Sequence, residues 1–349
     1  MDAPAATQQI PVQRVEEIWF PDGNLVIQAG SSLFRVYRGV LAARSPVFQD
    51  MLSFPQPPDS ELVEGCPLVH LTDWEMEVRL FLKAIFDPEF FMPFPYPTQF
   101  ATVAGCLRLS HKYGVDYLKR RALIHLSSGY DTTLDHWDTA STSNVDAAVA
   151  SYIMSWQWPE DLSFAIYAIQ LFREVDALWL LPTAFYNLSM YFTASLGRNV
   201  FHGTVYNGVP SVLSVQDQQS FATGHAIQCQ MEREILGFLV EPVDIVGCAS
   251  RSECITQRLE TLGEVQRSLT LIVTPEVRSP LDVWEEEGDW EDLEEGVCET
   301  CISALRTRYQ HRRQAFWERL PGMYGLPAWD VLEEMKTAAI GTTFVPDSQ

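Results

Sequence analysis

The spacing of the apolar residues changes at Arg38, and this change limits how the first part of the chain can fold. Before it, the apolar run 25–27 and the alternating run 33–38 flank a Gly/Ser turn, which is typical of paired antiparallel strands. After it, apolar residues recur at helical spacing and are interrupted at Ser45-Pro46. Serine is a good N-cap and proline suits the first helical position, so we expect two short helices that meet at Ser45.

Helices also dominate the rest of the first 130 residues. A short strand is expected over 68–71, followed by helices over 74–86, 100–113 and 115–126. Because strands come first and helices then gather on one side of them, the sequence predicts an α+β fold for this part of the chain.

The remainder is predicted to be mostly α-helical. Helical spacing recurs over about 162–172, after Pro182, over about 215–239, 252–272 and 299–319, and from Trp329, whereas 197–210 is expected to be a loop. Small polar residues at 138–151 indicate a linker between the two parts.

These patterns divide the chain into four segments. We expect a flexible N-terminus (1–14), an α+β domain (15–130), a linker with short elements (131–158) and a helical C-terminal domain (159–341).

Negative charge is concentrated in the second part. The formal net charge is −22, and residues 1–130 carry 11 basic and 14 acidic side chains against 13 and 32 in the remainder. Direct nucleic-acid binding is disfavoured, because neutralising phosphates requires clustered lysine and arginine. Nine carboxylates fall within residues 282–296. We expect a mobile acidic loop at about 279–297, with docking of a basic partner as the alternative interpretation.

No signal for a membrane or for secretion is evident. The strongly apolar stretch 177–186 is far shorter than the roughly 20 residues that a transmembrane helix needs, and residues 1–18 lack the pattern of a signal peptide. Seven cysteines, an odd number, do not suggest a secreted disulfide framework. We therefore expect a soluble, intracellular protein, with cytoplasm and nucleus both open.

Four of the cysteines form two pairs, Cys248-x5-Cys254 and Cys298-x2-Cys301. Two such pairs separated by a longer segment are the usual linear form of a four-cysteine structural zinc site, although the x5 spacing is looser than usual. Reduced thiols packed as small apolar side chains are an equally weighted alternative. A redox pair at Cys298 and Cys301 is disfavoured, because the carboxylates upstream oppose thiolate formation.

No motif for catalysis or for cofactor binding is found. Phosphate-binding glycine loops, HExxH and GxSxG are all absent from the sequence. His111 and His125 fall on helical segments where a hydrogen-bonded core histidine is expected. We therefore predict no catalytic residues, no cofactor-binding residues and no enzymatic activity.

Residues 20–127 resemble a BTB/POZ domain. The most specific block is 41–52 (LAARSPVFQDML), and 20–27, 33–38 and 107–115 add to the likeness. The narrower sequence RSPVF at 44–48 and the tail WERLPGMYGLPAW at 317–329 are similar to fungal BTB-domain proteins with a long helical C-terminal extension.

The resemblance implies a protein-interaction module that forms homodimers and recruits cullin-type ubiquitin ligases or transcriptional corepressors. Three departures from the family pattern argue against cullin contact: Tyr37 replaces a histidine common in the family, Phe86-Asp87-Pro88 replaces Tyr-Thr-Gly, and the segment FMPFPYP lacks a hydrophobic-x-Glu motif. Our leading hypothesis is therefore a non-enzymatic, self-associating adaptor whose helical region holds a second protein partner. The alternatives are a substrate receptor of a cullin-type ligase and a corepressor recruiter without direct DNA contact.

Overall fold

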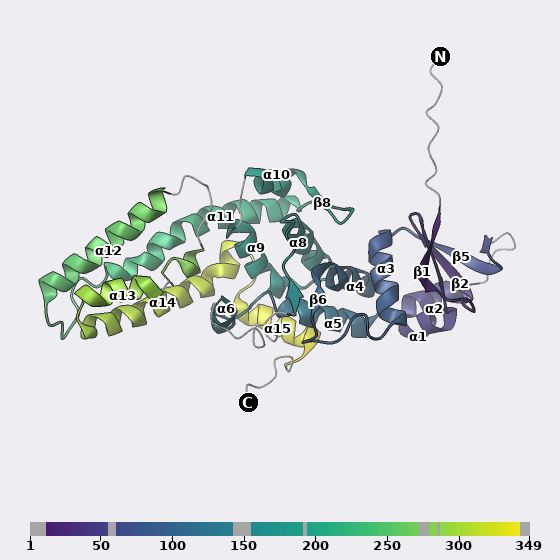
Figure 1. Cartoon of the computed structure of the whole chain (residues 1–349), viewed down its shortest axis with the longest axis horizontal. Helices are drawn as coiled ribbons and strands as arrows, with labels where there is room; N and C mark the ends of the chain where they lie inside the picture. The colour runs from purple at the N-terminus through teal and green to yellow at the C-terminus, as the bar shows by residue number, and fades with distance from the viewer. Residues whose placement is uncertain are drawn as a thin grey trace, which may run out of the picture.

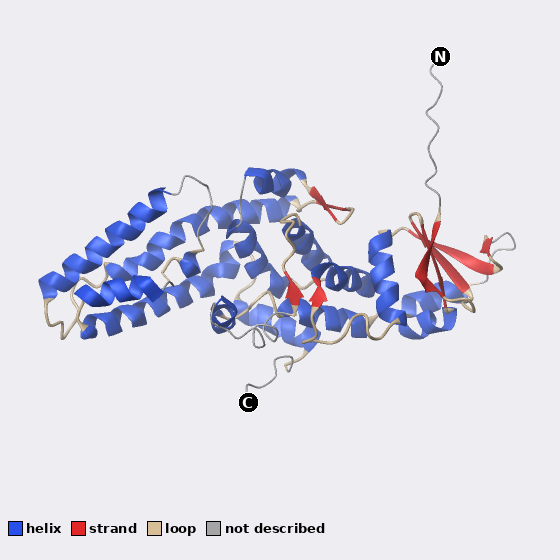
Figure 2. Cartoon of the chain, viewed as in Figure 1, coloured by secondary structure: helices blue, strands red, loops and turns tan. Residues whose placement is uncertain are grey.

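A curled five-stranded sheet lies at one end of the molecule (Figures 1 and 2). The computed structural model describes residues 12–54, 61–141, 155–190, 194–271, 279–284 and 287–342. The strand order is β1-β3-β2-β5-β4, in which β2 and β3 form the expected antiparallel hairpin and β5 runs parallel to β2. The strands are β1 (Gln13–Trp19), β2 (Leu25–Ala29), β3 (Ser32–Val36), β4 (Leu62–Val63) and β5 (Cys66–Leu71).

The prediction of a flexible N-terminus over residues 1–14 is wrong where that segment is described, because strand β1 begins there. Gln13 and Arg14 belong to β1, which runs parallel to β3 with Gln13 opposite Ser32. The Gln13 N–H donates to the Ser31 carbonyl at 2.7 Å, and Arg14 forms an ion pair with Glu64. Residues 1–11 of that predicted segment lie outside the described residues.

The helices of the first domain form where the apolar spacing predicts them. They are α1 (Arg38–Arg44), α2 (Pro46–Ser53), α3 (Glu75–Phe86), α4 (Phe100–Tyr113) and α5 (Asp116–Ser127). The predicted junction at Ser45 is confirmed, because its hydroxyl accepts a hydrogen bond from the Phe48 N–H at 3.0 Å and caps α2. Gly114, with φ of 67°, ends α4 in the left-handed conformation that glycine adopts without strain.

The rest of the described chain is mostly helical, and the fold class is therefore confirmed. The helices are α6 (Leu134–Ser141), α8 (Phe164–Glu174), α9 (Leu181–Met190), α10 (Ala194–His202), α11 (Val215–Leu236), α12 (Arg251–Leu271), α13 (Glu287–Gly296), α14 (Glu299–Met323) and α15 (Trp329–Ile340), with 3-10 turns η1 (Leu178–Leu180), η2 (Gly237–Leu239) and η3 (Pro280–Asp282). Helices α11 to α14 form an arm that extends away from the sheet (Figure 1).

Two segments that were expected to be irregular contain regular structure. Residues 197–210 include most of α10 and the hairpin of β8 (Thr204–Tyr206) and β9 (Val209–Ser211), so the loop prediction is wrong. Within 131–158, α6 is helical and β7 (Trp156–Gln157) pairs with β6 (Thr98–Gln99). Trp156 is fully buried, so this end of the predicted linker is part of the core. Residues 142–154 lie outside the described part.

The acidic segment is helical where it is described, and the prediction of a loop is wrong there. Trp284 and Leu293 are fully buried. Trp290 packs edge-on against Trp284, with ring centroids 5.5 Å apart, and lies under the Arg306 guanidinium at 4.6 Å. The aromatic residues between the carboxylates anchor α13 to the arm, while Glu291, Asp292, Glu294 and Glu295 remain exposed.

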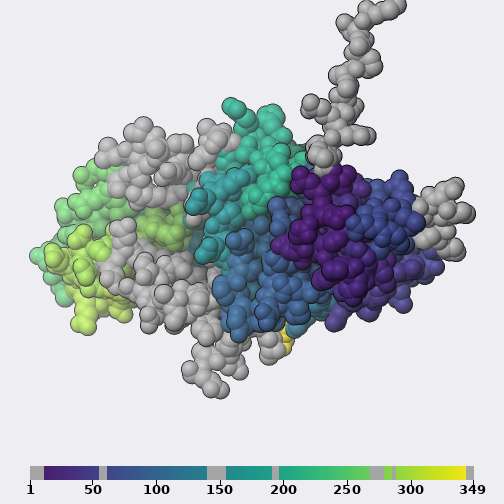
Figure 3. Space-filling model, turned by 45° about the vertical axis from the view of Figure 1, so that its right-hand side comes forward, coloured from purple at the N-terminus to yellow at the C-terminus, as the bar shows by residue number. Residues whose placement is uncertain are grey.

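The C-terminal helices return to the first domain and share one core with it. The Trp317 indole donates to the Thr132 carbonyl at 3.3 Å. The Lys336 ammonium donates to the Thr132 hydroxyl at 2.7 Å. Arg120 on α5 donates to the Ile340 carbonyl at the end of α15 at 2.6 Å. In the space-filling view the purple and blue residues of the first domain continue without a break into the teal helices (Figure 3).

Among the described helices, none is both long enough and apolar enough to cross a membrane.

Candidate metal centre

The four paired cysteines meet at the end of the arm. Cys248 lies in the loop before α12, and Cys254 lies in the first turn of that helix. Cys298 is the N-cap of α14, and Cys301 lies in its first turn. The N-termini of α12 and α14 lie at the end of the molecule opposite to the sheet (Figure 1).

The sulfur atoms are close enough together to share one ion. All four Sγ atoms lie within 4.8 Å of one another, and those of Cys248 and Cys298 are 3.9 Å apart. All four thiols are free of disulfides. A tetrahedral zinc site with Zn–S bonds of about 2.3 Å requires S···S separations of roughly 3.8 Å. The longest separation therefore has to shorten by about 1 Å, which is within the reach of side-chain rotation.

Backbone N–H groups point at the sulfur atoms. The backbone N–H groups of Ala249 and Cys301 lie near the Cys298 sulfur and lower its pKa to about 6, while the Cys301 N–H donates its hydrogen bond to the Cys298 carbonyl at 2.9 Å. The Cys298 N–H donates to the Cys254 sulfur at 3.3 Å. Two helix N-termini also direct their positive dipole ends to the cluster, which favours negative charge there.

Burial has the opposite effect on the pKa of the two buried thiols, those of Cys254 and Cys301. Cys254 and Cys301 are buried, and desolvation raises the pKa of both. Four thiolates therefore do not coexist here without a compensating cation. The burial of Cys301 also removes support from the redox interpretation of the Cys298 and Cys301 pair.

Arg258 was missed in the sequence. It lies one turn after Cys254 on α12 and is 2% exposed. Its guanidinium donates to the carbonyls of Leu239 and Pro242, both at 2.8 Å, and so fixes the loop that leads to Cys248. The signal that could have revealed it is the i, i+4 spacing from Cys254, which places both side chains on one face of the helix.

The two predicted core histidines have structural partners. His125 is fully buried; its Nδ1 lies 2.6 Å from the Ser155 hydroxyl and its Nε2 lies 3.0 Å from the Met92 carbonyl oxygen. Burial lowers its pKa to about 4, so the ring is neutral at pH 7. His111 is partly exposed, and its Nδ1 lies 2.9 Å from the Lys119 ammonium.

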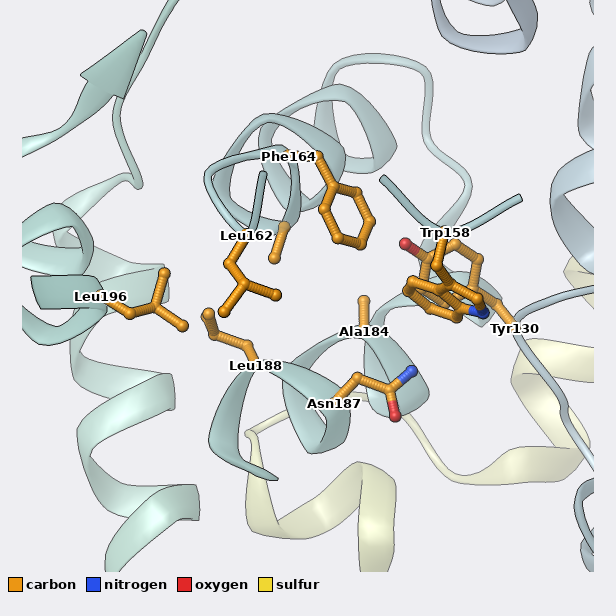
Figure 4. A pocket seen from close by; sticks show the side chains of 9 residues that line it. Tyr130, Trp158, Leu162, Phe164, Ala184, Asn187, Leu188 and Leu196 are labelled. Carbon is orange, nitrogen blue, oxygen red and sulfur yellow. The ribbon is translucent and has the colours of Figure 1, made fainter. Parts of the chain in front are cut away.

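An apolar cavity between α8, α9 and α10 is too small for a metabolite (Figure 4). Its volume is about 10 Å³, which is room for about one water molecule. The Asn187 amide is one of the few polar groups at its wall. The lining residues are Tyr130, Trp158, Leu162, Phe164, Ala165, Ala184, Asn187, Leu188 and Leu196.

Comparison with known protein families gives the identity of the first domain. Residues 20–129 match the family model of the BTB/POZ domain. The chain carries a BTB/POZ domain. The resemblance drawn from the 41–52 block is therefore confirmed, while the narrower likeness to fungal proteins stays a prediction. Neither a curated protein nor a solved structure was found to match the chain.

BTB/POZ domains are in general protein-interaction modules, and this one has an exposed apolar face. Val40 of α1, Val47 of α2 and Tyr117 of α5 are exposed. Tyr117 also lines an open groove of about 350 Å³, whose wall mixes the apolar Pro46 with the polar Arg44, Gln49 and Asp116. We call the surface of Val40, Val47 and Tyr117 the BTB apolar face.

The segment where the family has its cullin-contact motif is folded onto α5. Phe91 is 1% exposed, its ring lies beside that of His125 with centroids 5.1 Å apart, and its carbonyl accepts a hydrogen bond from Arg121. The next carbonyl, that of Met92, faces the His125 ring. The proline- and phenylalanine-rich segment is therefore held by the core of this chain.

Proposed function

We propose that the protein is a non-enzymatic, self-associating adaptor that joins two sets of protein partners. The observation that supports this most strongly is the BTB apolar face, which the described part of the helical region leaves uncovered. The helical region packs against the BTB domain through contacts of α8 with α4 and of α15 with α5, and it extends as an arm. One chain therefore presents two separate surfaces.

Self-association through the BTB apolar face is tested by light scattering coupled to size-exclusion chromatography on the full chain. The wild type is expected to be a dimer, and Val47→Glu is expected to shift it to monomer, because burying an unpaired carboxylate in an apolar contact is unfavourable. Val205→Glu is the matched control, since Val205 is exposed on the β8–β9 hairpin, remote in sequence from this face. A wild type that is monomeric at all concentrations contradicts self-association.

The partners are tested by affinity purification of the full chain and of its Val47→Glu variant. An adaptor is expected to retain the partners of its arm in both forms, because the substitution leaves the arm unchanged. Recovery of a cullin by direct binding of purified components would instead support the ligase-receptor alternative. The folded position of Phe91 and Met92 favours the adaptor, because a cullin would have to compete with contacts inside this chain.

We further propose that Cys248, Cys254, Cys298 and Cys301 hold one structural zinc ion. The donor set is all thiolate, the sulfur atoms converge to within 4.8 Å, and backbone N–H groups and helix N-termini face them. Zinc supplies the positive charge that such a set requires and takes four thiolate ligands in structural sites. The ion would fasten the loop before α12 to the start of α14.

Zinc is tested by elemental analysis of full-length protein purified without chelator. One zinc per chain is expected in the wild type and in Cys229→Ser, because Cys229 is exposed on α11 outside the cluster. Cys301→Ser is expected to lose the metal. Cobalt-exchanged wild type should show the thiolate-to-metal charge-transfer absorption of a tetrahedral sulfur site. A wild type without zinc that stays folded would support packed reduced thiols instead.

A further inference from the structure

The four cysteines of the proposed zinc centre fall into two classes. Cys254 and Cys301 are 2% and 1% exposed, whereas Cys248 and Cys298 are partly exposed. A solvent-borne reagent therefore reaches the sulfur atoms of Cys248 and Cys298 before the other two. The partly exposed pair is also the pair whose sulfur atoms lie 3.9 Å apart.

The backbone holds this pair together across a long stretch of sequence. The N–H of Ala249, the residue after Cys248, donates to the Cys298 sulfur. Arg258 fixes the same loop from its other side through the Leu239 and Pro242 carbonyls. The Cys248 sulfur is thus kept beside the Cys298 sulfur, and only a movement from 3.9 Å to the bond length of about 2.05 Å separates them from a disulfide.

We propose that Cys248 and Cys298 are a peroxide-oxidation site whose disulfide releases the metal, an inference that rests on the zinc centre proposed above. One thiolate of the pair attacks hydrogen peroxide, so that an S–O bond forms, the O–O bond breaks and hydroxide leaves. The other thiolate then attacks the resulting sulfenic sulfur, so that the S–S bond forms and a second hydroxide leaves. Two thiolates lose two electrons, and one peroxide and two solvent protons become two waters.

The disulfide removes two of the four zinc ligands. Cys254 and Cys301 alone provide two sulfur atoms in a buried environment, which is fewer than the four protein ligands of a structural site. The zinc ion therefore leaves. The disulfide still joins the loop to α14, so the end of the arm changes its metal content and charge while the chain stays connected.

The experiment treats full-length, metal-loaded protein with hydrogen peroxide. Released zinc is followed with a colorimetric chelator, and disulfides are mapped by non-reducing peptide mass spectrometry. The wild type and Cys229→Ser are expected to release one zinc per chain together with a peptide that links Cys248 to Cys298. Cys248→Ser is expected to release its zinc more slowly and to form no such peptide; if it does not fold, the wild-type peptide map decides alone.

The outcomes separate this inference from the zinc proposal. Zinc release accompanied by a link between Cys298 and Cys301, or between Cys254 and Cys301, overturns the oxidation assignment and leaves the zinc centre standing. A link between Cys248 and Cys298 in protein that was isolated without zinc supports the oxidation pair and overturns the metal centre. Oxidation confined to Cys229 overturns the oxidation assignment.

Discussion

Replacing Arg108 by methionine is expected to destabilise the junction between the BTB domain and the helical region by about 3–5 kcal/mol, the cost of removing one partner from a buried ion pair. Arg108 of α4 donates to the Glu77 carboxylate of α3 at 2.6 Å. The Tyr167 hydroxyl of α8 donates to the same carboxylate oxygen at 2.7 Å. Without Arg108, the Glu77 carboxylate, which is 4% exposed, keeps one donor and no counter-charge.

The contact of Arg108 with Glu174 adds little to this figure. It spans 2.9 Å, but the Glu174 side chain is 42% exposed, and ion pairs open to solvent contribute about 0–1 kcal/mol. Burial already raises the pKa of Glu77, against the opposing effect of Arg108. The loss in the variant should therefore shrink as the pH falls, because a protonated Glu77 carries no buried charge.

The assay is urea unfolding of the full chain, followed by circular dichroism at several pH values. Arg319→Met is the matched control, because Arg319 pairs with Glu234 at 2.6 Å while both side chains are about half exposed, and it should cost about 0–1 kcal/mol. Adding Glu77→Gln to Arg108→Met should recover much of the loss, since both charges are then gone. Equal losses for the two arginine variants, or a double variant no more stable than Arg108→Met, would refute the reasoning.

Two further predictions concern packing and pH. A Cβ on Gly224 would lie 2.2 Å from the ring of the fully buried Tyr324, whereas one on Gly263 meets nothing within 4 Å. Gly224→Ala should therefore destabilise the protein by about 1–3 kcal/mol, whereas Gly263→Ala should stabilise it by about 1 kcal/mol. Thermal unfolding measures both variants, and a similar loss of stability in the two would contradict this prediction. His125 has a folded pKa of about 4, below its ordinary value of about 6.5, so its neutral form stabilises the fold at pH 7 and that stability is lost as the pH falls through 6.5 towards 4. The difference in unfolding free energy between the wild type and His125→Gln should therefore narrow by about 3 kcal/mol between pH 7 and pH 4, and a constant difference would show that His125 does not titrate in this way.

Local signals predicted the BTB domain well. The junction at Ser45 follows from capping and from the proline after it, and both are properties of neighbouring residues. Strand β1 could not be predicted in this way, because its partner β3 lies beyond the β2 strand and the pairing is parallel. Nothing in residues 13–19 alone indicates which strand they would join.

Two errors came from weighing the wrong signal. The β8–β9 hairpin turns at Asn207-Gly208, both with positive φ, and Asn-Gly is the strongest short signal for a two-residue hairpin turn. In the acidic segment, net charge predicts a loop, but the buried Trp284 and the packed Trp290 decide the structure. Burial of large aromatic side chains stabilises a helix there, while the carboxylates of Glu291, Asp292, Glu294 and Glu295 stay exposed.

The cysteine cluster shows a different limit of sequence reasoning. The Cys298-x2-Cys301 spacing is a local pattern that the sequence shows directly. The x5 spacing of the other pair does not reveal that its two sulfur atoms lie close together. Cys248 lies outside α12 and Cys254 lies inside its first turn, so the chain bends between them and the two sulfur atoms reach the same point. Arg258, which holds the approaching loop, has no place in a ligand-spacing pattern.

The surroundings of this cluster support the proposed zinc ion over four neutral thiols. The N–H groups of Ala249, Cys301 and Cys298 and two helix N-termini all face the sulfur atoms, and such donors bind thiolates much more strongly than thiols. The acidic helix α13 ends directly before Cys298 and opposes additional negative charge there. Four neutral thiols would avoid repulsion by the acidic side chains of α13, but they would be poor acceptors for the N–H groups. Four free thiolates would be good acceptors, but the acidic side chains would repel them. A divalent ion bound to four thiolates satisfies both, because the sulfur atoms stay good acceptors while the ion cancels half of their charge.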